Sequence, residues 1–149
     1  MATILGTADQ EKSRARLFPW YGWVALFTLI AGELGLFLCV FAVQALFYFI
    51  AWWSYIVLVD AWVWRRRGHS LLRDRPWEFL VLAFWSVVIW NLFEAFNFRL
   101  QNWFYVNVPP LFLLGAIFTS FAYATVVPGL FETYDLLRAY GVGERARVR

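Results

Sequence analysis

The sequence predicts an all-α integral membrane protein that crosses the bilayer four times, as two helical hairpins with both termini in the cytoplasm. The first observation behind this prediction is composition: the 149 residues are 62% hydrophobic and only 15% charged, with a mean hydropathy of +0.60. The second is that the apolar residues form long runs, and a run of about 20 residues crosses a bilayer core of about 30 Å as a helix. The third is the position of the basic residues between those runs.

The basic residues set the predicted orientation. All 13 Lys and Arg residues except Arg99 fall on one side of the membrane if the chain crosses four times. By the positive-inside rule that side is the cytoplasm, as in a bacterial-type inner membrane. We therefore predict three parts, which are a cytoplasmic segment at 1–16, a transmembrane domain at 17–140 and a mobile tail at 141–149.

The first half of the chain predicts two crossings. Residues 1–16 carry no apolar stretch long enough for a cleaved signal peptide, so the first crossing is expected to be an uncleaved anchor. The segment from Trp20 to Trp64 contains no Lys or Arg, and as one helix it would be about 67 Å long, twice what a single crossing needs. It therefore predicts crossings at about 18–36 and 43–64.

The connection between these two crossings is less defined by the sequence. The paired glycines Gly32 and Gly35 weaken a helix, so the first crossing is expected to end near them. Residues 37–43 are too apolar for an exposed loop. They are predicted to be either a re-entrant segment or part of a helix.

The third crossing is predicted at 76–98. Pro76 suits the first position of a helix, and about 22 residues reach about 33 Å. Asn91, Glu94 and Asn97 recur at three-residue spacing, which places them on one strip of an otherwise apolar helix. An ionisable group inside a membrane is a functional candidate.

The fourth crossing is predicted at 110–137. Ala116, Ser120 and Ala124 follow one another at four-residue spacing, and small residues so spaced let a second helix approach closely. That second helix could belong to the same chain or to a partner. Pro128 and the glycine after it are expected to kink or end the regular helix.

Polar residues in the outer half of the membrane form the predicted intramembrane cluster. Glu33 and Glu94 each lie roughly 20 to 25 Å from the cytoplasmic edge by helical rise. The cluster could close a hydrogen-bond network, orient a lipid headgroup, or hold a proton for acid catalysis with Glu94 as the candidate catalytic group. Its predicted members are Glu33, Asn91, Glu94, Asn97 and Arg99.

Two further acids and five arginines are predicted at the cytoplasmic edge. Asp60 and Glu132 lie within about 7 to 9 Å of that edge by helical rise, so we expect them to pair with cytoplasmic arginines. The central loop is expected to contact anionic headgroups, and this accounts for its charge without a nucleic-acid partner. The headgroup candidates are Arg65, Arg66, Arg67, Arg73 and Arg75.

The chain holds ten tryptophans, and four of them fall inside crossings. Interior tryptophans can contact lipid or flank a flat ligand such as a quinone, carotenoid or chlorin, so the cofactor stays open. These four are Trp52, Trp53, Trp85 and Trp90. With one cysteine, the chain cannot form an internal disulfide or supply a cysteine-based metal cluster. With one histidine, it cannot by itself supply both axial ligands of a bis-histidine haem. We therefore predict no metal site.

Two functions remain open at this point. The sequence lacks the standard catalytic motifs. The fragment PWEF at 76–79, with intramembrane acids and tryptophan-rich helices, is similar to the small membrane-embedded carotenoid cyclases. The doubled acidic pair expected after that proline is absent, so the chain is not assigned to that family.

We predict a small accessory or scaffolding subunit of a larger membrane complex, energy-transducing or pigment- or quinone-containing, with lipids and other transmembrane subunits as partners. The alternative is a membrane-embedded enzyme acting on a lipid or isoprenoid, with Glu94 as acid or base.

Overall fold

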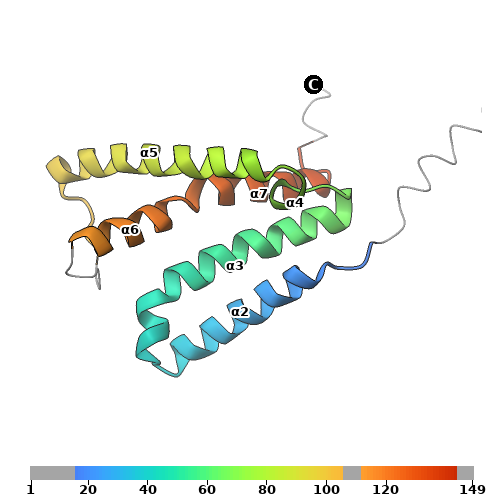
Figure 1. Ribbon diagram of the computed structural model, residues 1–149, viewed down its shortest axis with the longest axis horizontal. Helices are drawn as coiled ribbons and strands as arrows, with labels where there is room; N and C mark the ends of the chain where they lie inside the picture. The colour runs from blue at the N-terminus through green and yellow to red at the C-terminus, as the bar shows by residue number, and fades with distance from the viewer. Residues whose placement is uncertain (1–15, 106–111, 144–149) are drawn as a thin grey trace, which may run out of the picture.

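The computed structural model describes residues 16–105 and 112–143, and every regular element in these ranges is an α-helix (Figure 1). The helices are α2 (Trp20–Phe37), α3 (Phe41–Arg67), α4 (Leu71–Asp74), α5 (Pro76–Leu100), α6 (Phe112–Tyr123) and α7 (Val126–Ala139). The predicted cytoplasmic segment up to residue 15 and the predicted tail from residue 144 lie outside the described residues. The fold class is therefore all-α, as the sequence predicts.

Helices α2, α3 and α5 are each long and apolar enough to cross a membrane. Only 17%, 17% and 11% of their most apolar stretches are buried inside the chain. Large apolar side chains such as Trp20, Phe27 and Phe84 are more than 60% exposed. Because so much exposed apolar surface is unfavourable in water, these helices support a multi-pass membrane protein.

Helices α2 and α3 form a tight hairpin, and two glycines allow it. A Cβ atom on Gly32 would lie 2.5 Å from Ile50 Cγ2, and one on Gly35 would lie 2.8 Å from Val43 Cγ2. Helix α2 ends at Phe37, two residues after Gly35, so the first crossing ends near these glycines as expected, but α2 runs through both of them and they do not interrupt it. The glycines serve close helix approach instead.

The connection between α2 and α3 is a short turn over Leu38–Val40, in which Cys39 has a φ of 56°. Backbone N–H groups in this turn bond to carbonyls of the last turn of α2, as from Val40 to Gly35 at 2.9 Å. Residues 37–43 are thus two helix ends and a turn. They do not form the re-entrant segment that the sequence left open.

The second hairpin begins as predicted and is broken where it returns. Pro76 occupies the start of α5. The predicted fourth crossing at 110–137 is two helices, α6 and α7, separated at Ala124 and Thr125. The 12 residues of α6 reach only about 18 Å, which is too short for a crossing by itself.

Pro128 explains the position of this break. A proline ring clashes with the carbonyl four residues earlier and cannot donate to it, and here that carbonyl belongs to Ala124. The predicted kink therefore lies before the proline rather than at Pro128 itself. The buried Ser86 of α5 compensates, because its hydroxyl donates to the carbonyl of Tyr123 and accepts the N–H of Val127 at 3.0 Å.

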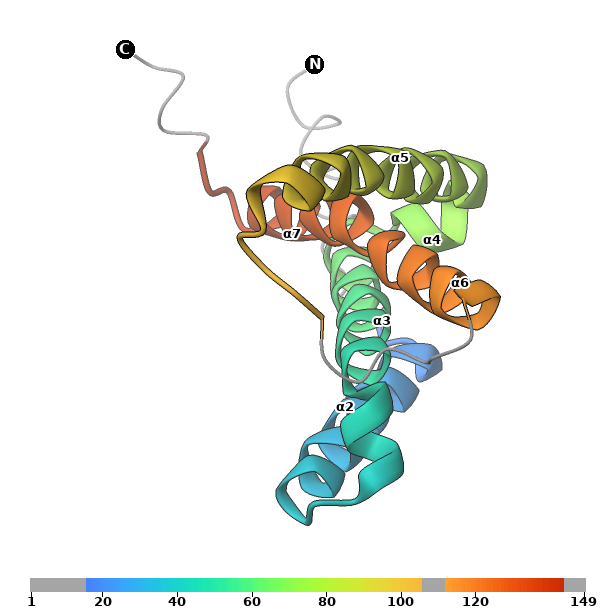
Figure 2. The same cartoon turned by 90° about the vertical axis from the view of Figure 1, so that its left-hand side faces the viewer.

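Helix α3 is the centre of the bundle. It packs on α2, α4 and α7, while α5 packs on α4, α6 and α7. The core lies at the end of the bundle next to α4, where Ile56, Leu71 and Phe79 are buried together. The opposite ends of the α2–α3 and α5–α6 pairs diverge, as two perpendicular views show (Figures 1 and 2). One end of the molecule is therefore closed and polar, and the other is open.

Candidate functional site

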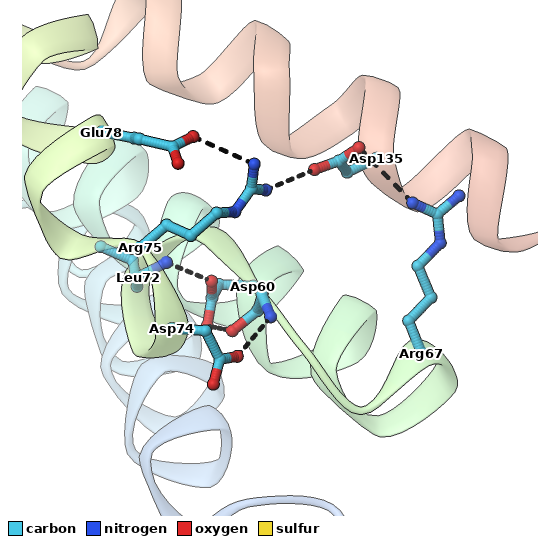
Figure 3. A network of polar contacts seen from close by, with 8 residues as sticks. Asp60, Arg67, Leu72, Asp74, Arg75, Glu78 and Asp135 are labelled. Carbon is cyan, nitrogen blue, oxygen red and sulfur yellow. Dashed lines mark hydrogen bonds and ion pairs between the residues drawn. The ribbon is translucent and has the colours of Figure 1, made fainter. Parts of the chain in front are cut away.

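The closed end is organised around Asp60, which is fully buried on α3. Its Oδ2 accepts the hydroxyls of Tyr21 at 3.1 Å and Ser70 at 2.9 Å. Its Oδ1 accepts the backbone N–H of Leu72 at 2.8 Å, from the short helix α4 (Figure 3). One carboxylate thus holds α2, α3 and α4 together, and three donors satisfy its charge.

Glu132 lies on α7, which packs on α3 next to Asp60, where the hydroxyl oxygens of Tyr55 and Thr133 are 2.7 Å apart. It is 1% exposed. Neither of its carboxyl oxygens has a hydrogen-bond donor of standard geometry among the described residues. Since buried polar atoms are nearly always satisfied, a buried carboxyl group without donors is the most unusual polar feature at this end of the bundle.

The arginines at this end bind other acids. Asp135 of α7 accepts Arg67 and Arg75, each at 3.5 Å, and Arg75 also pairs with Glu78 at 3.0 Å (Figure 3). The prediction that Asp60 and Glu132 pair with cytoplasmic arginines was therefore wrong. The physical reason is that Ser70 and α4 fold back over α3 and supply neutral donors to Asp60, while Asp135 occupies the more exposed face of α7.

The predicted headgroup arginines lie around this network. The guanidinium of Arg66 lies 4.2 Å from the ring centroid of Tyr140, and that of Arg73 lies 4.3 Å from that of Trp64. Arg65 is exposed at the end of α3. Cation–π contacts and ion pairs of this kind fix the loop at the end of the bundle. Contact with lipid headgroups stays a prediction.

A second polar centre lies at the open end, around Glu94 of α5. Its Oε1 accepts the indole N–H of Trp103 at 3.0 Å and the hydroxyl of Tyr105. The hydroxyl of Tyr123 and the indole N–H of Trp90 lie 3.3 and 3.4 Å from the Tyr105 oxygen. A half-buried carboxylate is thus surrounded by aromatic donors from α5, α6 and the segment after α5.

Asn97 positions two of these aromatic residues. Its Oδ1 accepts the backbone N–H groups of Asn102 at 3.0 Å and Trp103 at 3.2 Å. Its Nδ2 donates to the carbonyl of Trp103 at 2.9 Å. Asn97 thereby turns the chain back along α5, so that the side chains of Trp103 and Tyr105 reach Glu94.

The structure assembles only part of the predicted outer cluster. Glu94 and Asn97 act together, as just described. Asn91 donates instead to the carbonyl of Val87 in its own helix, at 2.8 Å. Glu33 is exposed on α2, which packs on α3, and Arg99 is exposed near the end of α5.

The four interior tryptophans have different surroundings. Trp53 stacks on Phe121 with ring centroids 4.7 Å apart, and its indole N–H is buried without a partner among the described residues. Trp90 belongs to the Glu94 centre. Trp85 is exposed, and Trp52 is partly exposed with its ring next to Gly129 of α7. A quinone, carotenoid or chlorin between these rings stays a prediction.

The small residues of α6 line an open groove. Its cavity volume is about 440 Å³, and its walls are Ala116, Ile117, Ser120, Phe121 and Ala124. On the same helix Gly115 and Tyr123 are buried. Ala116 is exposed and Ser120 and Ala124 are partly exposed, so this face stays open, while Phe121 at its edge packs on Trp53 of α3.

Comparison with protein-family models, with curated proteins and with solved structures found no match. The function is therefore inferred from the two polar centres and the α6 groove. Sequence reasoning missed Tyr21 and Ser70 as partners of Asp60, and Trp103 and Tyr105 as partners of Glu94. The similar depth of Asp60 and Glu132 was a signal that the two could meet, but it was interpreted as proximity to arginines.

Proposed function

We propose that this chain is a four-pass inner-membrane accessory or scaffolding subunit, with both termini in the cytoplasm, whose α6 groove receives a transmembrane helix of a partner protein. The observation that carries the proposal is the outward-facing groove of Ala116, Ser120 and Ala124. In this proposal α6 and α7 together make the fourth pass. A break inside a membrane is tolerated where protein groups satisfy the backbone, and Ser86 does so here.

The chemistry of the groove fits a helix. Small side chains let two backbones approach closely, and the hydroxyl of Ser120 can bond to the backbone or a polar side chain of the incoming helix. The two hairpins also diverge at this end of the bundle (Figure 2). The exposed aromatic residues and the arginine-rich end would then contact lipid and neighbouring subunits.

Bulky substitutions in the groove should release the partner. We expect Ala116→Leu or Ser120→Leu to reduce the amount of co-purifying membrane protein at least about tenfold in mild detergent, which corresponds to a loss of about 1.4 kcal/mol. The matched control is Ala95→Leu, which adds the same bulk on an exposed face of α5. Quantitative mass spectrometry of the purified complex is the measurement. A complex that survives both groove substitutions would remove the groove as a docking site.

The enzyme alternative depends on Glu94, which is half-buried beside Trp103 and Tyr105. It requires the purified chain alone to transform a lipid or isoprenoid in a membrane extract. Glu94→Gln should abolish that activity if Glu94 is the acid or base, whereas the subunit proposal expects Glu94→Gln to leave assembly largely intact. Product analysis by chromatography, run beside the co-purification assay, separates the two functions.

A further inference from the structure

We propose that Asp60 and Glu132 form a buried proton-binding site, in which a single proton is held between the two carboxyl groups at neutral pH and allows α7 to pack on α3. The proposal goes beyond the docking function and does not use the α6 groove. It rests on the packing of α7 on α3 next to these residues, where the hydroxyl oxygens of Tyr55 and Thr133 lie 2.7 Å apart, on the burial of both carboxyl groups, and on the absence of donors to Glu132 among the described residues.

The hydrogen bonds decide which carboxyl group carries the proton. Asp60 accepts three donors, from Tyr21, Ser70 and Leu72, so both of its oxygens are already hydrogen-bonded. Glu132 is as deeply buried and accepts none. A second buried negative charge without donors would be strongly unfavourable. The proton therefore resides on Glu132, where the neutral carboxylic acid can donate to Asp60.

Among the described residues, no unengaged positive charge replaces the proton. The charged groups around Glu132 are Asp60 on α3, Asp135 on its own helix and Arg75 at the start of α5. Arg75 is engaged by Glu78 and Asp135, and on α4 Asp74 accepts the backbone N–H of Ser70 at 2.7 Å. The described residues contain no group of three or more His, Cys, Asp or Glu side chains that could hold a metal ion. The chemistry of the pair thus favours a proton as its ligand.

A route for the proton reaches Asp60 from the closed end. A cavity of about 650 Å³ is lined by residues at the start of α2, by α3 and by α4, and its walls include Tyr21, Asp60 and Arg73.

Loss of the proton would leave two adjacent negative charges between α3 and α7. Because the folded protein would hold one more proton than the unfolded chain, its stability should fall as the pH rises, by up to about tenfold in the folding equilibrium constant per pH unit.

Infrared spectroscopy of the full chain in detergent tests the site directly. At neutral pH we expect the stretching band of a protonated carboxylic acid. The band should be lost in Glu132→Gln and should persist in Glu33→Gln, the matched control, which alters an exposed membrane carboxyl group on α2. The fall in thermal unfolding midpoint between neutral and alkaline pH should likewise be abolished in Glu132→Gln.

Glutamine has the shape of a protonated glutamic acid and can donate to Asp60, so Glu132→Gln should fold with α7 packed on α3. A band that survives Glu132→Gln, or an alkaline loss of stability identical in both proteins, would overturn the proposal. Failure of Glu132→Gln to fold would overturn it as well, because a neutral donor at this position would then not replace the native group.

Discussion

Asp60→Ala is expected to lower the free energy of unfolding by roughly 3 kcal/mol or more, because it leaves buried donors without an acceptor at costs of about 1 to 3 kcal/mol each. Those donors are the hydroxyls of Tyr21 and Ser70 and the N–H of Leu72, and they belong to separate segments of the chain. We therefore expect α2 and α4 to loosen together from α3. Chemical unfolding in mild detergent, followed by tryptophan fluorescence, measures the effect.

The matched control for this prediction is Asp74→Ala. Asp74 is exposed and accepts the backbone N–H of Ser70, so its loss should cost only about 1 kcal/mol. Equal effects of the two substitutions would mean that Asp60 does not organise the closed end of the bundle.

Gly32→Leu should destabilise the α2–α3 hairpin by about 1 to 3 kcal/mol, the range for forcing extra bulk into a packed contact. Even the first added carbon would lie 2.5 Å from Ile50 Cγ2. Ala31→Leu adds bulk one residue earlier on an exposed face and should leave stability unchanged. Thermal unfolding in detergent compares the two variants.

A second substitution makes this test specific. Ile50→Ala removes the side chain that the introduced leucine would displace, so stability should be partly restored when it is combined with Gly32→Leu. If the two substitutions simply add, or if Gly32→Leu behaves like Ala31→Leu, the close approach of α2 and α3 at Gly32 does not contribute to stability.

The features of the fold that depend on composition could be predicted from the sequence. Apolar runs of sufficient length indicate the helices α2, α3 and α5, and Pro76 marks the start of α5 because its ring suits a first turn. The roles of Gly32 and Gly35 could not be predicted, since a glycine that weakens an isolated helix also permits close packing, and only the neighbouring helix decides between the two. The interruption of the helix near Pro128 could be predicted from the proline itself, whereas the hydrogen bonds by which Ser86 of α5 satisfies the break could not.

The candidate sites, too, could be predicted only where they depend on one helix and not where they depend on packing between segments. Glu94 and Asn97 could be predicted as polar partners because three-residue spacing places them on one helix face. Their aromatic donors, Trp103 and Tyr105, come from a segment whose return path is set by Asn97 itself. Helical rise placed Asp60 and Glu132 at one depth, but contact between them depends on the packing of α7 against α3, for which the sequence carries no spacing signal.

Labelling of the single cysteine in intact cells is the most direct test of a four-pass chain with both termini inside. Cys39 is exposed in the turn between α2 and α3, so a membrane-impermeant maleimide should modify it from outside the cell. In a Cys39→Ser background, His69→Cys, in the exposed connection between α3 and α4, should react only after permeabilisation. Protection of Cys39 together with external labelling of the His69→Cys variant would contradict this topology.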